Sequence, residues 1–166
     1  MVSFRQNGLA EAFIDAAGDA GSAPHAADAL IVAAYCRAAE TLLETMSTAL
    51  AGPGPWLDRW ERAVRAVVAA VRTRPGLARL ALTEPESAAI RERRMRYRHA
   101  YIDVFAAEYA RGRDPEELPG LHVELVAGAA YRAYVAETRA GRLTDPQADV
   151  VPRLVSVMAI LEPAQT

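Results

Sequence analysis

Lysine, cysteine and long apolar runs are what this 166-residue sequence has least of. All 19 basic residues are arginine, and the net charge of −2 argues against a generally basic nucleic-acid-binding protein. The single cysteine, Cys36, excludes an internal disulfide and a cysteine-based zinc site. No apolar run reaches the roughly 18 residues of a membrane span, which argues against a membrane-spanning chain.

Signals for secretion and for β-structure are also missing. The first residues contain one early base, Arg5, and no long apolar stretch. We therefore expect no secretory signal peptide, and we expect the protein in the cytoplasm. The sequence has no useful period-two alternation, no Asn-Gly or Asp-Gly hairpin and no repeat period.

What the chain does contain favours helices. Hydrophobic residues make up 52% of the sequence, and 36 residues are alanine, the strongest helix former. Proline and glycine divide the chain into blocks, several of which have apolar residues at steps of three and four. We expect helices over residues 4–17, 24–51, 56–73, 77–83, 86–111, 120–140 and 146–161. Pro152 either bends the last helix or marks its true first turn. The predicted fold is all-α, an antiparallel bundle of about six or seven helices.

The last predicted helix is apolar on almost every side, because Arg153 and Ser156 are the only polar residues in 150–161. A helix of this kind must be covered all round, and a chain this small has few layers to cover it. A second copy would complete the cover, with the small residues 127–130 letting its helices approach closely about a two-fold axis. The alternative is that this helix is central in the monomer. The expected dimer interface consists of Leu125, Gly128, Ala129, Arg132, Val151, Leu154, Val155, Met158 and Leu161.

Four stretches share helix order, proline and glycine breaks and local sequence with a known family. They read HAADALIVAAYCRAAETLLETM, PWLDRWERAVRAVVAAVRTRPGLARLAL, LPGLHVELVAGAAYRAYVAETRAG and VPRLVSVMAIL. Over about residues 25–162 the chain resembles the C-terminal regulatory domain of TetR-type transcriptional regulators. The resemblance implies an all-helical domain that dimerises through its last two helices. It also implies a mostly apolar effector cavity between segments 24–51, 56–73, 86–111 and 120–140.

In that family, effector binding alters the spacing of two N-terminal helix-turn-helix heads. Residues 1–24 contain one base, Arg5, against Glu11, Asp15 and Asp19, which is too few donors for a recognition helix. We therefore assign 1–24 as a short helix plus loop and 25–166 as the effector-binding and dimerisation domain. DNA would be bound only through a head that this chain lacks. The head lies outside the given sequence, the start is misplaced, or the protein is a headless relative.

Aromatic residues with polar tips are the best candidates for lining an effector pocket, because they combine apolar surface with orienting groups. The residues that could line such a cavity are each also suited to an ordinary core. They are Trp60, Met95, Tyr101, Phe105, Tyr131 and Tyr134. Arg98 shares a helix face with Tyr101, so its guanidinium needs a partner. That partner is Glu108, Glu124 or an acidic ligand, unless the side chain extends to water. The predicted ligand-binding set is Trp60, Met95, Arg98, Tyr101, Ile102, Phe105 and Tyr131, for a small apolar or acidic effector.

Other chemistry has little support in the sequence. The arginines in 91–98 point in several directions, which favours a solvated, salt-bridged helix start over a nucleic-acid patch. His25, His99 and His122 are scattered, so we expect no metal, and we expect no cofactor. No phosphate-binding loop or nucleophile elbow is present, so we do not expect an enzyme. The main alternative is a headless helical dimerisation or protein-interaction module without a ligand. A small helical enzyme and direct DNA binding by the arginine-rich helix are further alternatives.

Overall fold

The computed structural model describes residues 23–82, 88–111 and 120–161, and these residues form six helices and no strand. The predicted all-α class is therefore confirmed. The predicted helix over 4–17 lies outside the described residues. Among the described residues, no helix combines enough length with enough apolar character to cross a membrane. The helices are α2 (Ala23–Leu50), α3 (Trp56–Thr73), α4 (Gly76–Leu82), α5 (Ala88–Ala110), α6 (Gly120–Arg139) and α7 (Val151–Leu161).

Glycine and proline set most of the helix boundaries. The sequence Gly-Pro-Gly-Pro at 52–55 separates α2 from α3, and Gly54 has φ +107°, where a side chain would be strained. Gly141, with φ +72°, follows α6, and its amide donates to the Thr138 carbonyl at 2.9 Å. This is the left-handed residue that commonly ends a helix. Through α6, the observed ends lie within two residues of those expected.

The start of α7 decides between the two alternatives given for Pro152 and shortens the expected helix. Helix was expected from residue 146, but α7 begins at Val151, so Pro152 lies in its first turn, where a missing amide donor costs nothing. Residues 140–150 instead form turns that bury Leu143 and Val150. Arg142 holds this segment by donating to both carboxylate oxygens of Glu137, at 2.6 and 3.0 Å. These hydrogen bonds are the main reason that the pKa of Glu137 is lowered.

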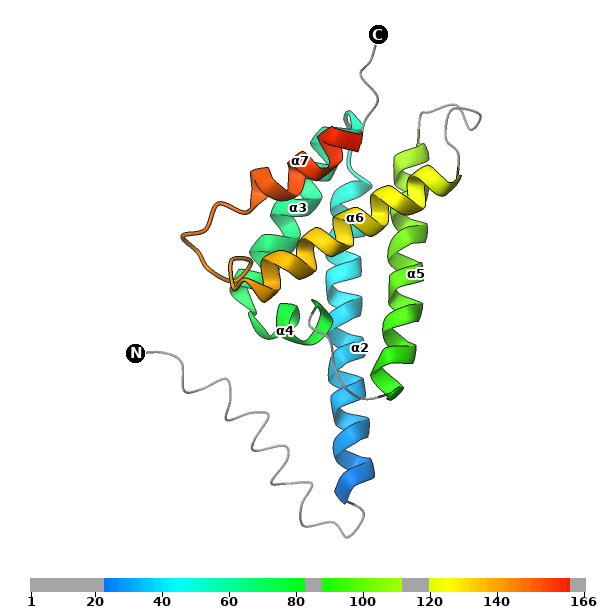
Figure 1. The fold of residues 1–166 in the computed structure, drawn as a ribbon, viewed down its shortest axis with the longest axis vertical. Coiled ribbons are helices and arrows are strands. Elements are labelled where there is room, and N and C mark those ends of the chain that lie inside the picture. The colour runs from blue at the N-terminus through cyan, green and yellow to red at the C-terminus, as the bar shows by residue number, and fades with distance from the viewer. Residues whose placement is uncertain (1–22, 83–87, 112–119, 162–166) are drawn as a thin grey trace.

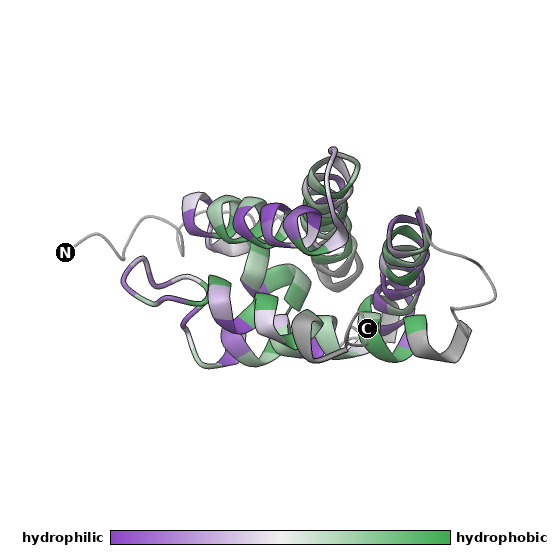
Figure 2. Cartoon of the chain, turned by 90° about the horizontal axis from the view of Figure 1, so that it is seen from above, coloured by the Kyte–Doolittle hydropathy of each residue, from purple (hydrophilic) through white to green (hydrophobic). Residues whose placement is uncertain are grey.

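The long helix α2 is the centre of the packing. It contacts α3, α4 and α5, while α6 contacts α4, α5 and α7, and α7 also packs against α3. In Figure 1, α5 runs beside α2, α6 crosses them obliquely, and the amino-terminal part of α2 extends beyond the other helices. The same helices viewed from above carry both hydrophobic (green) and hydrophilic (purple) residues (Figure 2).

Aromatic rings from three helices form the middle of the core. Trp60 is completely buried, and its ring centre lies 5.7 Å from that of Phe105 and 6.4 Å from that of Tyr134. Its indole N–H donates to the Leu154 carbonyl at 3.4 Å, which connects α3 to α7. Trp56 makes an edge contact with Phe105 at 5.1 Å. These contacts join α3, α5, α6 and α7 around one side chain.

A buried ion pair closes one end of the bundle. Arg59 is only 3% exposed and donates to the Glu108 side chain at 2.7 Å and to the Glu108 carbonyl at 2.8 Å. Its guanidinium also lies 5.5 Å from the Trp56 ring centre. Arg111 contacts the same carboxylate at 3.1 Å and donates to the Leu50 carbonyl at 3.0 Å. The interactions of Arg59, Glu108 and Arg111 therefore connect the carboxyl-terminal ends of α2 and α5 to the start of α3.

We predict that Glu108→Ala lowers the free energy of unfolding by about 2 kcal/mol, because it leaves the buried Arg59 charge without its counter-ion. Glu61→Ala is the matched control, since Glu61 pairs with Arg65 on the exposed surface of α3. The control should change the free energy by no more than about 0.5 kcal/mol. Urea unfolding followed by circular dichroism measures both, and equal losses would contradict the prediction.

Candidate functional site

Five helices, α2 to α6, contribute to the walls of a partly open cavity of about 80 Å³. Its walls are largely apolar, with tyrosines and two arginines among them. The lining residues are Tyr35, Ala39, Leu42, Leu43, Met46, Val67, Ala81, Leu82, Arg94, Tyr97, Arg98, Tyr101, Tyr131 and Tyr134. A mostly apolar hollow with a few polar groups is the usual character of a small-molecule site.

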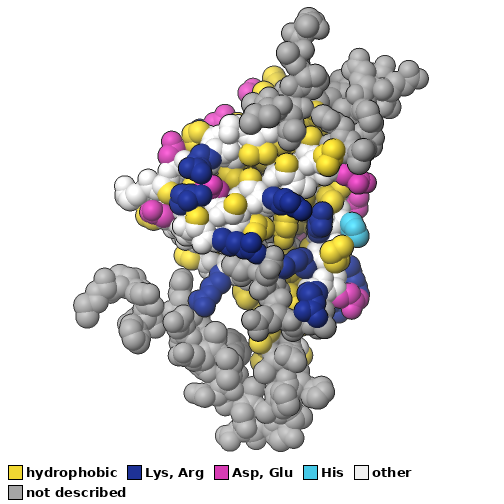
Figure 3. All heavy atoms as spheres, in the orientation of Figure 1, with side chains coloured by type: hydrophobic (Ala, Val, Ile, Leu, Met, Phe, Trp, Pro, Cys, Tyr) yellow, Lys and Arg dark blue, Asp and Glu magenta, His cyan; other side chains and the backbone are white. Residues whose placement is uncertain are grey.

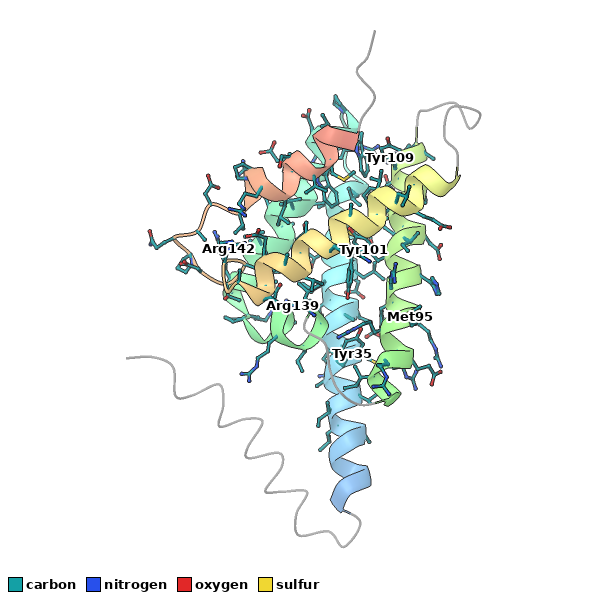
Figure 4. All side chains as sticks on the ribbon, in the orientation of Figure 1. Tyr35, Met95, Tyr101, Tyr109, Arg139 and Arg142 are labelled. Carbon is teal, nitrogen blue, oxygen red and sulfur yellow. The ribbon has the colours of Figure 1, made fainter. Side chains whose placement is uncertain are left out.

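Helical periodicity explains how each wall is built. On α2, Tyr35, Ala39, Leu42 and Met46 recur at steps of three and four and therefore share one face. On α5, the same steps place four residues from 94 to 101 on the cavity side. Figure 4 shows Tyr35 on α2 and Tyr101 on α5, with α6 crossing beside them.

Two tyrosines that line this cavity have buried hydroxyls without a hydrogen-bond partner in the described part of the structure. They are Tyr101 and Tyr134, the latter with a side chain that is 4% exposed. Burial raises the pKa of both phenols, so both remain hydrogen-bond donors at neutral pH. A buried hydroxyl without a partner costs about 1–3 kcal/mol. A ligand oxygen that accepts from them would recover part of that cost.

The other tyrosines at the cavity wall are held by partners. The Tyr97 hydroxyl donates to Glu40 at 2.6 Å, and its ring meets that of Tyr35 edge-on at 6.0 Å. Burial also raises the pKa of Tyr35, while its hydrogen bond with Arg94 opposes that rise. These contacts fix the α2–α5 side of the cavity.

A wider groove of about 460 Å³ adjoins the cavity between α5 and α6. The two hollows share Leu82, Arg94, Arg98 and Tyr131 as lining residues. The rest of the groove is lined by Met95, Gly128, Arg132, Val135, Ala136 and Arg139. Among the described residues, the lining thus includes four arginines and no acidic side chain. Figure 3 shows arginine side chains (dark blue) across the centre and lower part of this face.

The structure brings together part of the predicted ligand-binding set. Arg98, Tyr101 and Tyr131 line the cavity, as does Tyr134, and Met95 lines the groove. Trp60 and Phe105 instead lie wholly inside the aromatic core, and Ile102 packs against that core without lining either hollow. These three residues were expected to contact the ligand, but they line neither the cavity nor the groove. The reason is that large rings fill the space where α3 and α5 meet, so no void remains beside them.

The expected carboxylate partner of Arg98 is also corrected. Glu108 binds Arg59 and Arg111, and no ion pair joins Arg98 to Glu124 among the described residues. Arg98 is exposed while it lines the cavity, so the side chain extends toward water with its stem along the apolar wall.

Most of the lining was missed by sequence reasoning. Tyr35, Leu42 and Met46 were placed on the apolar face of their helix, yet nothing in that pattern separated residues at a void from residues in contact with neighbours. Ala39 and Ala81 leave space for the cavity because their side chains are small. Small residues are so abundant in this chain that size alone does not identify a cavity wall. Arg94 and Tyr97 share the face of Arg98 and Tyr101, which is the one signal that would have extended the predicted set.

The predicted dimer-interface residues fall into two groups. Leu125 is 63% exposed, Arg132 is exposed, and Gly128, Ala129, Val151 and Val155 are half-buried. Leu154 and Met158 are fully buried within the single chain, and the side chain of Leu161 lies outside the described ones. Gly128 and Arg132 also line the groove between α5 and α6, so self-association would use Leu125 of α6 together with Val151 and Val155 of α7.

The arginine-rich start of α5 carries a surface ion pair. Arg96 pairs there with Glu92, as expected for a salt-bridged helix. Within residues 23–82, 88–111 and 120–161, no group of three or more metal-ligating side chains occurs. His25 and His122 have side chains outside the described ones.

The fold and site thus define an all-α bundle with a partly open cavity and an arginine-lined groove. No protein-family model matches the chain, and no curated protein or solved structure matches it significantly.

The buried tyrosines predict the stability of the protein at alkaline pH. The pKa values of Tyr35, Tyr97, Tyr101 and Tyr134 are raised in the folded state, chiefly by burial. Above about pH 10 the unfolded chain loses phenolic protons that the folded chain keeps. The contribution of these tyrosines to the free energy of unfolding should therefore be constant below about pH 10. Above that pH it should fall, by up to about 1.4 kcal/mol per pH unit for each proton that the folded chain retains.

Urea unfolding at increasing pH, with tyrosinate absorbance followed in parallel, measures this effect. Tyr134→Phe removes one of the four phenols and should make the fall less steep. Complete ionisation of all tyrosines with no loss of stability would contradict the prediction.

Proposed function

We propose that this chain is the small-molecule-sensing, dimerising regulatory domain of a TetR-like transcriptional regulator that acts in the cytoplasm. The observation that carries the proposal is the tyrosine-lined cavity bounded by α2 to α6. DNA would be bound only through a head that these residues do not supply.

The position of the cavity supports the sensing role. It lies among α2, α3, α5 and α6, the segments between which the TetR resemblance implies an effector site, with α4 completing the wall. The two buried hydroxyls without partners provide donors for a ligand.

The proposed mechanism is a shift between helix arrangements. A ligand that contacts α2, α5 and α6 together binds best to the arrangement that positions its contacts, and it favours that arrangement by its difference in affinity. The change passes to α7 through α6, because these two helices pack against each other.

Self-association is supported by the outer side of α6 and α7. Leu125 is the most exposed of the large hydrophobic side chains described, and half-buried Val151 and Val155 lie on α7. A two-fold contact would cover these residues with the same residues of a second copy. This surface equally suits the alternative function, a dimerisation or protein-interaction module without a ligand.

Filling the cavity tests the sensing role. Ala39→Met extends a side chain from α2 into the cavity, whereas Ala69→Met adds the same atoms on the exposed side of α3. A set of small apolar and acidic molecules is examined by thermal shift and calorimetry. A ligand at a hundred times its Kd stabilises the folded chain by about 2.7 kcal/mol.

We expect binding to the wild type and to Ala69→Met, and a loss of at least about tenfold in affinity for Ala39→Met because the added atoms occupy the ligand volume. Absence of binding by every molecule would exclude the sensing role. Equal affinity in both variants would place the ligand elsewhere.

Charge placed on the outer side of α6 tests self-association. We expect the wild type to sediment at twice 17.9 kDa. Leu125→Glu should return it to the monomer mass, because a carboxylate buried at an apolar contact is costly. Leu80→Glu is the control, since Leu80 is an exposed leucine on α4. A wild type that stays monomeric at high concentration, or equal behaviour of the two variants, would refute the proposed interface.

A further inference from the structure

We propose that the ligand of this site is an amphipathic organic anion, whose short apolar or aromatic part enters the tyrosine cavity while its oxyanion is bound by Arg98 and Arg132 in the adjoining groove. This inference rests on the proposed sensing function and names the chemical class of the ligand.

The first observation is the charge of the groove. Arg94, Arg98, Arg132 and Arg139 all line it, and none of the described residues that line it is acidic. The chain as a whole carries a net charge of −2, so this concentration of positive charge is a local property. A hollow lined by one sign of charge raises the local concentration of ligands of the opposite sign.

The second observation is that two of these guanidiniums are uncommitted. Arg59, Arg65, Arg96 and Arg111 each pair with a carboxylate. Arg98 and Arg132 have neither an ion pair nor a hydrogen bond with any residue in the described part of the chain, and both are exposed. A guanidinium binds a carboxylate or phosphate through two parallel hydrogen bonds, which makes these two side chains suited to an oxyanion.

The third observation is the junction of the hollows. Arg98 and Tyr131 line both, so one molecule of modest size can occupy the cavity and the groove together. The cavity of about 80 Å³ admits only a short apolar group, whereas the groove of about 460 Å³ has room for a larger polar one. Tyr101 and Tyr134 line the cavity, and their hydroxyls have no partner among the described residues. These hydroxyls would donate hydrogen bonds to the few polar atoms near the apolar end of the ligand.

The experiment compares acids with neutral molecules of the same shape. Phenylacetate is paired with phenylacetamide and hexanoate with hexanamide, phenyl phosphate tests the phosphate head, and inorganic phosphate tests the head alone. Calorimetry with the full chain at low and high salt gives each affinity. We expect at least about tenfold tighter binding of the acid than of its amide, weakening as salt rises, and weak binding of inorganic phosphate.

Arg98→Gln and Arg132→Gln should each weaken binding of the acid far more than binding of its amide, and so remove most of the preference for the acid. Arg98→Lys, which keeps the charge but loses the paired hydrogen bonds, should fall between Arg98→Gln and the wild type. Arg65→Gln alters the net charge equally on the exposed surface of α3 and should leave every affinity unchanged. Helical circular dichroism checks that each variant is folded, and all of these positions are exposed.

The outcomes separate this inference from the sensing proposal. Amides that bind as tightly as acids, or an acid preference that survives both glutamine variants, would overturn the inference while sensing stands. Binding of inorganic phosphate as tight as that of phenyl phosphate would also overturn it, because the cavity would then contribute nothing. Absence of binding by every probe, neutral and anionic alike, would overturn both.

Discussion

The arrangement of the bundle depends on the buried indole of Trp60. Its ring contacts Phe105 of α5 and Tyr134 of α6, and its N–H donates to the backbone of α7. Four helices therefore take their relative positions from one side chain that is completely buried. Large aromatic residues bury the most apolar area per side chain and have few rotatable bonds, which suits them to this role.

The same packing explains why a cavity remains next to the core. Phe105 fills the space beside Trp60, and Tyr101, one turn earlier on α5, is the last ring of the stack at 6.2 Å from it. The cavity wall beside Tyr101 also includes Ala39 of α2 and Ala81 of α4, whose short side chains cannot fill the volume of a ring. The tyrosines thus mark the boundary between a densely packed core and a hollow.

Sequence reasoning predicted the helices well because helix ends depend on local signals. Gly and Pro at 52–55 and Gly141 end helices through backbone conformation, which a sequence displays directly. The α7 start was misplaced because Pro146 and Pro152 both suit a first turn, and only tertiary contacts such as Arg142 with Glu137 decide between them. Site residues were harder to predict. Periodicity identifies the buried face of α5, but whether Phe105 or Tyr101 borders a void depends on what the opposite helix offers. Charge pairing was similarly hidden, since Glu108 joins Arg59 from 49 residues away.

The length of α2 has a mechanical consequence. With 28 residues, the helix is about 42 Å long, and its cavity-lining residues run from Tyr35, near its middle, to Met46, one turn from its carboxyl end. Its carboxyl end is held by Arg111, which donates to the carbonyls of Leu50 and Gly52. Its amino end extends past the other helices in Figure 1, where Leu30 and Ile31 are exposed. The helix is therefore held at its carboxyl end, while its amino end lies far from those contacts. If the helix tilted by about 5° about its carboxyl end, its amino end would move by roughly 4 Å over such a length.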